Sequence, residues 1–502
     1  MLYGAADPAL FCKANTVRPG RGFCFYNFAG IVLAAAVSVN FNAEIGRIRP
    51  ELHSSGFGPT ICSCPQETID DIKSMRFKAA RTHDWALINP GQRVCDYFHM
   101  FPSLQLDAKD PKNYVFGPTD YLLKRAREEA GLDIFFRLGT SIEHSGPNVH
   151  FNTLIPADFD KMAEIFAGTI RHYNAGWGDG FRWGIKHWEI WNEPDGLNKT
   201  WCLPDGDLGK GETDEARRAD FKARDAKRRD LFVKFFVTCL KRIKGEFPDV
   251  KVGGPSLRCM NVEYFKALLQ GCKEARVAPD FISWHHYTKN PDTIMNAIET
   301  GRKLCDDFGF KDCQLVINEW HFFGEYGWPG LRSPDPAERR RAWGPGPGSH
   351  TGIDSSCFTL TMLEKFQTSK LDQAFFYGCR HTGAWGYMDE QRNKFKLYHG
   401  LKLFGEFTRW VNVICEAKGA DGITVLAAKS DDGRHRGFLL TDFRSGESEI
   451  TVDVKGVEPN AETWSWVHDY ANDYEPVPTR CKNGRVVIRK NDRNSATYLV
   501  WF

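Results

Sequence analysis

Two short stretches of this sequence each place a glutamate where an apolar run ends. The first reads K-H-W-E-I-W-N-E-P-D over residues 186–195, and its apolar part has the character of a buried strand. Pro194 cannot continue the hydrogen-bond ladder of a strand, so Glu193 is predicted where the strand opens into a loop. The second stretch reads Q-L-V-I-N-E-W over residues 314–320 and carries Glu319 in the same position.

Two carboxylates that end two different strands suit one chemistry above others, the cleavage of a glycosidic bond. In a retaining mechanism, carboxyl groups about 5–5.5 Å apart flank the bond. One attacks the anomeric carbon, while the other, with a raised pKa, protonates the leaving oxygen and later deprotonates a water molecule. The glutamate of a lone N-E-P or N-E-W motif would be interpreted as an ordinary surface acid. Two Asn-Glu pairs at two strand ends favour the catalytic interpretation.

Strands and helices alternate through most of the chain. Because a regular alternation indicates a parallel sheet, and eight repeats over about 350 residues fit a closed barrel, we expect a (β/α)8 TIM barrel. The predicted strands lie near residues 52–58, 77–84, 133–138, 187–191, 250–254, 281–287, 314–320 and 373–377. The predicted helices cover residues 66–75, 118–130, 156–173, 231–247, 264–272, 292–308, 355–368 and 396–407, with a separate charged helical segment at 212–230 and a Pro/Gly-rich loop at 324–350.

The pattern changes near Arg409, after which short alternating runs separated by turn residues predict an antiparallel β-sandwich. Strands predicted within residues 23–49 have no place in the barrel, so we expect them to complete that sandwich. The predicted layout is an N-terminal segment at 1–49, a catalytic barrel at 50–408 and a C-terminal β-sandwich at 409–502.

Composition narrows the classes of function. The 66 Lys and Arg residues against 64 Asp and Glu leave a net charge of +2, so no field of one sign favours nucleic acid or a membrane surface. The 15 cysteines are odd in number and scattered, which favours free thiols and a cytoplasmic location over a secreted one. Residues 25–38 resemble a signal-peptide core, but the apolar core is short and the region before it is long. The next residues, 37–41, alternate like a strand, so we expect this part of the chain to belong to the fold. The run at 25–38 is too short to span a bilayer.

Several motifs resemble those of retaining glycoside hydrolases built on (β/α)8 barrels. They are W-N-E-P and I-N-E-W, with R-T-H-D at 81–84, S-W-H-H-Y at 283–287 and F-P-D-V-K-V-G-G-P at 247–255. The finer pattern is most similar to glycoside hydrolase family 39, the family of β-xylosidases and α-L-iduronidases, over roughly residues 35–502. The resemblance implies that Glu193 is the acid/base, that Glu319 is the nucleophile and that Asn192 holds the sugar's 2-hydroxyl group. It also implies an oligosaccharide or glycoside substrate and exo action, with no cofactor and no metal; a homo-oligomer stays open.

Further polar and aromatic residues are predicted around the two glutamates. Arg81 and His83 share one face of the second strand, where a guanidinium would keep Glu319 ionised. On the sixth strand, His285 and Tyr287 face the cleft and His286 faces away. The remaining candidates are Trp385 as a sugar platform, Glu143 as a selector of the glycone, and an interior ion pair of Glu189 with Arg137.

The sequence leaves open which sugar the protein acts on. It also leaves two other classes of protein to be considered. A β-xylosidase-like specificity is favoured, with β-galactosidase, arabinosidase and α-L-iduronidase as alternatives, and Arg332 or Arg380 would supply the cation that an iduronidase needs. The long 324–350 loop is expected to wall one side of the cleft, which favours exo action. A carbohydrate-binding protein without activity would not need both glutamates. A metal-dependent hydrolase is disfavoured because no H-x-H motif ends the first strand.

Overall fold

The computed structural model divides into two compact units, Met1–Ala34 and Ala35–Phe502. It describes residues 37–56, 66–83, 85, 93–141, 153–197, 199–379, 385–389, 391–491 and 494–502. All of the described residues belong to the second unit. The strands predicted before residue 37, together with Glu143 and Arg380, lie outside the described residues.

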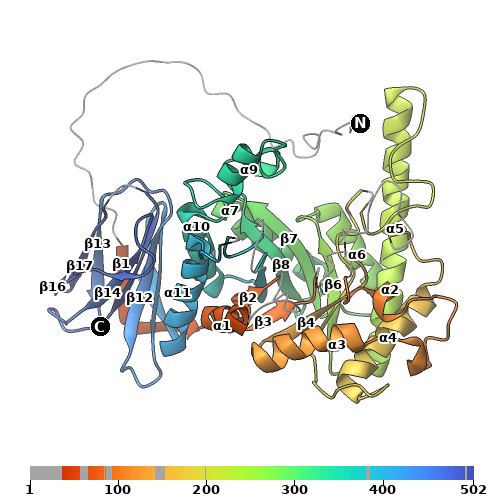
Figure 1. Ribbon diagram of the computed structural model, residues 1–502, viewed down its shortest axis with the longest axis horizontal. Coiled ribbons are helices and arrows are strands. Elements are labelled where there is room, and N and C mark those ends of the chain that lie inside the picture. The colour runs from red at the N-terminus through yellow and green to blue at the C-terminus, as the bar shows by residue number, and fades with distance from the viewer. Residues whose placement is uncertain are drawn as a thin grey trace. The chain divides into compact units, whose positions relative to one another are not determined.

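Eight parallel strands close into a barrel, which confirms the predicted fold class (Figure 1). They are β2 (Ser54–Ser55), β3 (Ala79–Arg81), β4 (Asp133–Leu138), β5 (His187–Ile190), β6 (Lys251–Leu257), β7 (Phe281–Thr288), β8 (Gln314–Phe322) and β9 (Gln373–Phe376). The strands are buried on both faces, as expected for a parallel sheet covered by helices. Because the chain leaves every strand at the same end of the barrel, residues that follow different strands converge there.

The helices that surround the barrel lie close to their predicted positions, except that the short helix α2 was not predicted. They include α1 (Gln66–Met75), α2 (Tyr97–Met100), α3 (Gly117–Lys124), α4 (Phe159–Ala175), α5 (Asp214–Glu246), α6 (Val262–Glu274), α7 (Pro291–Phe308), α10 (Ile353–Gln367) and α11 (Lys396–Trp410). Several begin at a side chain that accepts a hydrogen bond from the first turn, such as Asn261 before α6 and Asn290 before α7. The predicted helix at 118–130 differs, because α3 ends at Lys124 and a π-helical turn follows at Arg125–Glu129.

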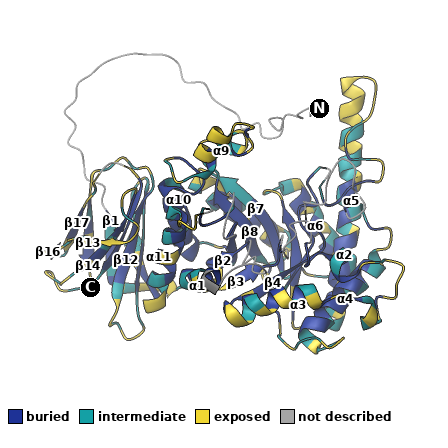
Figure 2. Ribbon diagram, in the orientation of Figure 1, coloured by how far each residue is buried: buried dark blue, intermediate teal, exposed yellow. Residues whose placement is uncertain are grey.

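The charged segment at 212–230 is not a separate helix but the first half of α5, which runs for 33 residues. Thr213 accepts a hydrogen bond from the Ala216 N–H and so caps the start of the helix. No proline and no glycine interrupts the sequence between the two predicted segments. Figure 2 shows that the N-terminal half of α5 is largely exposed, whereas the second half is buried against the barrel.

The predicted loop at 324–350 contains two short helices, α8 (Gly327–Leu331) and α9 (Pro336–Trp343). Asp335 caps α9 and Pro336 occupies its first position, a combination that favours a helix start. The indole Nε1 of Trp343 donates a hydrogen bond to the Leu331 carbonyl at 3.1 Å and so ties the two helices together.

The C-terminal part forms one ten-stranded sheet in the order β15-β14-β18-β12-β11-β10-β1-β13-β17-β16. Its strands are β1 (Val37–Arg47), β10 (Val413–Lys418), β11 (Ile423–Lys429), β12 (Arg436–Asp442), β13 (Glu449–Lys455), β14 (Trp464–His468), β15 (Glu475–Pro476), β16 (Cys481–Lys482), β17 (Arg485–Arg489) and β18 (Ala496–Trp501). The predicted sandwich is therefore a single sheet that curls around its own apolar core. β1 lies between β10 and β13, which confirms that an N-terminal strand completes this sheet.

The sheet packs on the barrel through α10 and α11. Leu426, Leu439 and Leu499 point to the helices and join the barrel's apolar core. Glu364 of α10 is also buried there, and its carboxyl group accepts a hydrogen bond from the Thr441 hydroxyl at 2.6 Å. Burial raises the pKa of Glu364 to about 8, against the opposing effect of the neighbouring hydroxyl groups.

We predict that Glu364 makes the stability of the protein fall as the pH rises. Its pKa is raised in the folded state, so between about pH 4.5 and pH 8 the folded protein binds a proton that the unfolded chain releases. The free energy of unfolding should decrease over this range by several kcal/mol, ~1.4 kcal/mol per pKa unit. The Glu364→Gln variant keeps the acceptor for Thr441 and should lose this decrease, as measured by urea unfolding at pH 5 and pH 9.

Glu274→Gln is the matched control, because this glutamate is exposed at the end of α6. The control variant should keep the pH dependence of the wild type. A Glu364→Gln variant with the same pH dependence as the wild type would contradict the assignment.

Candidate active site

Glu193 stands in a tight turn directly after β5, as the sequence predicts. Both Trp191 and Glu193 have positive φ values, 77° and 47°, which side chains other than glycine rarely adopt. Such residues persist only when their surroundings hold them in place. Here the Glu193 N–H donates to the Ser256 carbonyl at 2.9 Å, and the Thr200 hydroxyl donates to the Asn192 carbonyl at 2.5 Å. The turn therefore fixes the position of the Glu193 carboxylate.

Glu319 lies within β8 and faces Glu193 across the end of the barrel. The Nδ1 atom of His285 lies 2.8 Å from Glu193 Oε1 and 3.3 Å from Glu319 Oε2. One oxygen of each carboxylate and this nitrogen all lie within 4.8 Å of one another. Both glutamates are mostly buried, with exposed fractions of 8% and 5%. The structure thus brings the two predicted carboxylates together over one small space.

Arg81, at the end of β3, is fully buried beneath the two carboxylates. Its Nη1 donates to Glu319 Oε1 at 2.9 Å and its Nε donates to Glu189 Oε2 at 2.7 Å. Its Nη2 donates to Asn192 Oδ1 at 2.8 Å and to Ser256 Oγ at 2.9 Å. One guanidinium therefore orients residues from β5, β6 and β8.

The predicted ion pair of Glu189 with Arg137 is wrong. Glu189 pairs with Arg81, and Arg137 instead bonds Asp96 with an Nη2–Oδ1 distance of 2.5 Å. Asp96 precedes α2, and it also accepts hydrogen bonds from the N–H and hydroxyl groups of Ser141. The two arginines therefore serve different carboxylates, although Arg137 and Glu189 are register partners on adjacent strands.

The three candidates on β7 and His83 on the stretch after β3 lie as their positions predict. The Tyr287 hydroxyl donates to Glu319 Oε2 at 2.7 Å, and His83 Nε2 lies 3.4 Å from Glu319 Oε1. His285 lies between the two carboxylates. His286 faces away from the site, where its Nε2 lies 3.2 Å from the Thr293 hydroxyl oxygen.

Two residues that sequence reasoning missed, Ser256 and Asn318, connect this network. The Ser256 hydroxyl lies 2.5 Å from His285 Nε2 and accepts a hydrogen bond from Asn318 Nδ2 at 2.9 Å. Asn318 Nδ2 also donates to Glu189 at 2.5 Å. The only sequence signal for Ser256 was its place after the G-G-P run, and that for Asn318 was its place before Glu319.

The Asn192 side chain is oriented by its oxygen alone. That oxygen accepts from Arg81 and from the Ser256 hydroxyl, at 2.8 and 3.1 Å. Its Nδ2 is buried without a hydrogen-bond partner among the described residues. A buried donor of this kind is costly unless a ligand satisfies it, so it fits the predicted contact with a substrate hydroxyl group.

Trp385 lies beside Tyr287, with ring centroids 5.8 Å apart, and is partly exposed. Further rings surround it, with centroid distances of 5.1 Å to Tyr377, 5.5 Å to Trp343 and 6.3 Å to Trp328. The last two belong to α9 and α8, so the 324–350 segment reaches the same end of the barrel as the carboxylates.

The charged groups shift one another's pKa. Burial opposes a proton on His285, but Glu319 and Glu193 overcome this effect and raise its pKa. Burial acts to raise the pKa of Glu193. The hydrogen bond from His285 and the positive charge of His285 outweigh burial, so the pKa of this carboxyl group is lowered. Burial raises the pKa of Glu319, against the opposing charges of His285 and Arg81. The raised pKa expected of the acid/base is therefore found on His285 and Glu319 instead of Glu193.

Glu193, His285 and Glu319 also form a donor set that could hold a divalent cation. In this structure, however, both Glu319 oxygens already accept hydrogen bonds, one from Arg81 and one from Tyr287. The nearby guanidinium would repel a metal ion. The residues present therefore fit acid–base chemistry better than metal binding.

Comparison with known proteins supports the predicted class. The sequence profile of the family described as "Glycosyl hydrolases family 39" matches residues 213–308. A beta-xylosidase from Geobacillus stearothermophilus is 27% identical over 193 residues, which are 34% of this chain and 32% of the relative. The chain thus spans about a third of the length of that curated relative.

The chain resembles glycoside hydrolase family 39. This finding confirms the resemblance inferred from the W-N-E-P and I-N-E-W motifs.

Two solved structures share the fold of this chain. A glucosidase from Croceicoccus marinus superposes with a TM-score of 0.69 at 19% identity, over 93% of this chain and 99% of that one. An alpha-L-arabinofuranosidase from Thermotoga maritima superposes with a TM-score of 0.61 at 11% identity, again over 93% and 99%. Identities this low establish the fold alone.

We predict that Arg81→Met destabilises the protein by about 3–5 kcal/mol, because it leaves two buried carboxylates without their cation. Urea unfolding at pH 7 measures this loss. Arg489→Met is the control, since Arg489 is 77% exposed and its pair with Glu449 is worth about 0–1 kcal/mol. Equal stabilities of the two variants would contradict a central structural role for Arg81.

Proposed function

We propose that the protein is a retaining, exo-acting glycoside hydrolase that uses Glu193 and Glu319 in a double displacement. The observation that carries the proposal is the spacing of the two carboxylates, whose nearest oxygens lie within 4.8 Å of each other. Retaining enzymes place their carboxyl groups about 5–5.5 Å apart, whereas inverting enzymes need about 6.5–9.5 Å to fit a water molecule.

In the first step, a Glu319 oxygen attacks the anomeric carbon and the bond from that carbon to the leaving oxygen breaks. The leaving oxygen takes a proton from the Glu193–His285 pair and departs as an alcohol. Both carboxylates raise the pKa of His285, which favours a proton on its ring in the free site. Its 2.8 Å contact with Glu193 gives the proton a direct path to the acid/base.

In the second step, Glu193 takes a proton from a water molecule, whose oxygen attacks the anomeric carbon. The ester bond to Glu319 breaks, and the sugar leaves with its original anomeric configuration. The nucleophile must be ionised at the start of each cycle. Arg81 and Tyr287 favour the ionised form because each donates a hydrogen bond to a different oxygen of Glu319.

Asn192 would bind the sugar's 2-hydroxyl group through its unpartnered Nδ2. A contact that strengthens as charge develops at the neighbouring carbon lowers the barrier more than it favours substrate binding. The rigid hold on the Asn192 oxygen by Arg81 and Ser256 means that little reorganisation is needed.

A β-xyloside-like substrate is the best-supported choice. A curated relative with a detectable sequence match is named a beta-xylosidase. The aromatic rings of α8, α9 and Trp385 gather at the end of the barrel that holds the carboxylates, which favours removal of single sugars from chain ends. Nitrophenyl β-xyloside, β-galactoside, α-arabinofuranoside and α-iduronide, assayed side by side, would rank xylose against the alternative sugars.

We predict that Glu193→Ala and Glu319→Gly each abolish turnover of nitrophenyl β-xyloside at neutral pH. Loss of the acid/base should lower kcat/KM by about 10²–10⁴-fold for poor leaving groups. Azide should restore activity to Glu193→Ala, because this anion attacks the glycosyl-enzyme without a general base. The product of that reaction would be a β-xylosyl azide, identified by mass spectrometry.

Glu274→Ala is the control for the removal of an acidic side chain far from the site, and it should keep wild-type kinetics. A near-wild-type kcat in either active-site variant would refute the assignment of that residue.

A further inference from the structure

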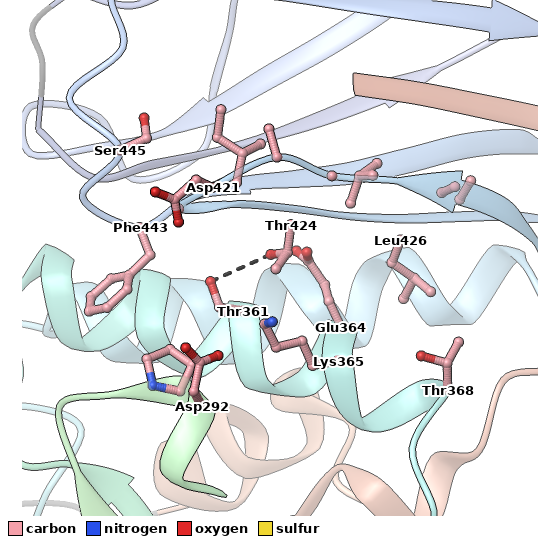
Figure 3. A pocket seen from close by; sticks show the side chains of 18 of the residues that line it. Asp292, Thr361, Glu364, Lys365, Thr368, Asp421, Thr424, Leu426, Phe443 and Ser445 are labelled. Atoms are coloured by element: carbon pink, nitrogen blue, oxygen red, sulfur yellow. Dashed lines mark hydrogen bonds between the residues drawn. The ribbon is translucent and has the colours of Figure 1, made fainter. Parts of the chain in front are cut away.

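A second cavity of about 580 Å³ lies between the barrel and the C-terminal sheet. Figure 3 shows side chains of α10 on one side of it and side chains of β11 on the other. Thr361, Glu364 and Lys365 line it from one face of α10, and Thr368 lines it directly after the helix. The volume falls within the range of small-molecule sites, about 300–1,000 Å³. None of the residues proposed for catalysis lines this cavity.

The strongest polar feature of this cavity is the carboxyl group of Glu364. This side chain is 4% exposed, and its Oε1 accepts the hydrogen bond from Thr441. Its Oε2 is buried, and the neighbouring Thr424 hydroxyl interacts with the carboxyl group and opposes the rise of its pKa. Because burial raises the pKa of Glu364 to about 8, the group carries a proton at neutral pH and can donate it to a ligand oxygen.

Polar and charged groups surround this acid. The Thr424 hydroxyl donates a hydrogen bond to Thr361 Oγ1 at 3.5 Å, which links β11 to α10 at the edge of the cavity. Asp292, Lys365 and Asp421 also line the cavity, and their charged groups form no ion pair within the described part of the chain. The cavity therefore offers hydrogen-bond donors and acceptors together.

The walls also include apolar surface. Phe443 and Leu426 line the cavity next to these polar groups. Phe443 is held in place by Phe358, with ring centroids 5.6 Å apart. An aromatic face beside several hydroxyl and carboxyl groups matches a ligand that has both C–H faces and many hydroxyl groups.

The charges decide which class of ligand fits. An anion would meet Asp292 and Asp421, and a cation would meet Lys365. The three-atom metal-ligand sets found among the described residues comprise the Glu193, His285 and Glu319 group and none from this cavity. A neutral molecule with many hydroxyl groups can satisfy the carboxylates, the ammonium group and the protonated acid at once.

We propose that the cavity between α10 and β11 is a binding site for a neutral sugar or similar polyol, separate from the active site. Glu364 donates a hydrogen bond to a ligand hydroxyl, and Asp421 and Lys365 bind further hydroxyl groups at the rim. Phe443 contacts the C–H face of the ring. The site would hold a glycan on the C-terminal sheet without cleaving it.

Calorimetric titration of the whole chain tests this proposal, with xylobiose, cellobiose and lactose as probes. All proteins carry Glu319→Gln so that no probe is hydrolysed. Thr424→Trp fills the cavity from the sheet, and Asp421→Ala removes a rim carboxylate. Glu462→Ala is the matched control, because this exposed carboxylate lies on the same sheet outside the cavity.

We expect at least one probe to bind with a Kd that Thr424→Trp raises at least about tenfold and that Asp421→Ala raises in the same direction. Glu462→Ala should leave the Kd unchanged. In an otherwise wild-type background, Thr424→Trp should leave nitrophenyl β-xyloside hydrolysis unchanged, which also shows that the variant folds.

The proposal is overturned if no probe binds at millimolar concentration, or if Thr424→Trp leaves every Kd unchanged. Its failure is distinct from failure of the proposed catalytic function, because binding is measured without turnover and at a different set of residues.

Discussion

The active site depends on a single buried guanidinium. Arg81 bonds Glu189 below and Glu319 above, and it holds the oxygen of Asn192 in place. A buried cation between carboxylates is stable only when its hydrogen bonds are well formed, and here four bonds at 2.7–2.9 Å satisfy it. The same bonds let two carboxylates and an imidazole crowd into a space of 4.8 Å. The positive charge of Arg81 therefore balances the buried carboxylates and makes their acid–base chemistry feasible.

Much of the fold was predictable because it follows from local patterns. Most barrel strands are short apolar runs that end in polar or turn residues, and each strand was expected within a few positions of where it lies. The details that the local patterns did not predict depend on longer-range packing. The charged start of α5 continues the amphipathic helix because no residue breaks it, although it covers no core. The predicted sandwich is one sheet because β1 joins β10 to β13, a pairing between segments far apart in the sequence.

The positions of site residues were predictable where the alternation of side chains along a strand decides which face each side chain lies on. This rule placed Tyr287 next to Glu319 and turned His286 away. It could not identify partners across the barrel, so Arg137 was assigned to the wrong carboxylate. Arg137 bonds Asp96, which lies in a loop whose sequence shows neither the periodicity of a helix nor that of a strand. The sequence also could not predict which of these groups have raised pKa values, because that depends on the position of His285 between both glutamates.

The account is tested most directly by the configuration of the sugar that is released first. Proton NMR during hydrolysis of nitrophenyl β-xyloside distinguishes the two anomers of xylose before they equilibrate. Two carboxylates within 4.8 Å leave no room for a water molecule between them and the sugar, so the account predicts that β-xylose appears first and α-xylose forms only later. Initial release of α-xylose would contradict it, because inversion requires a water molecule where this structure places Glu319.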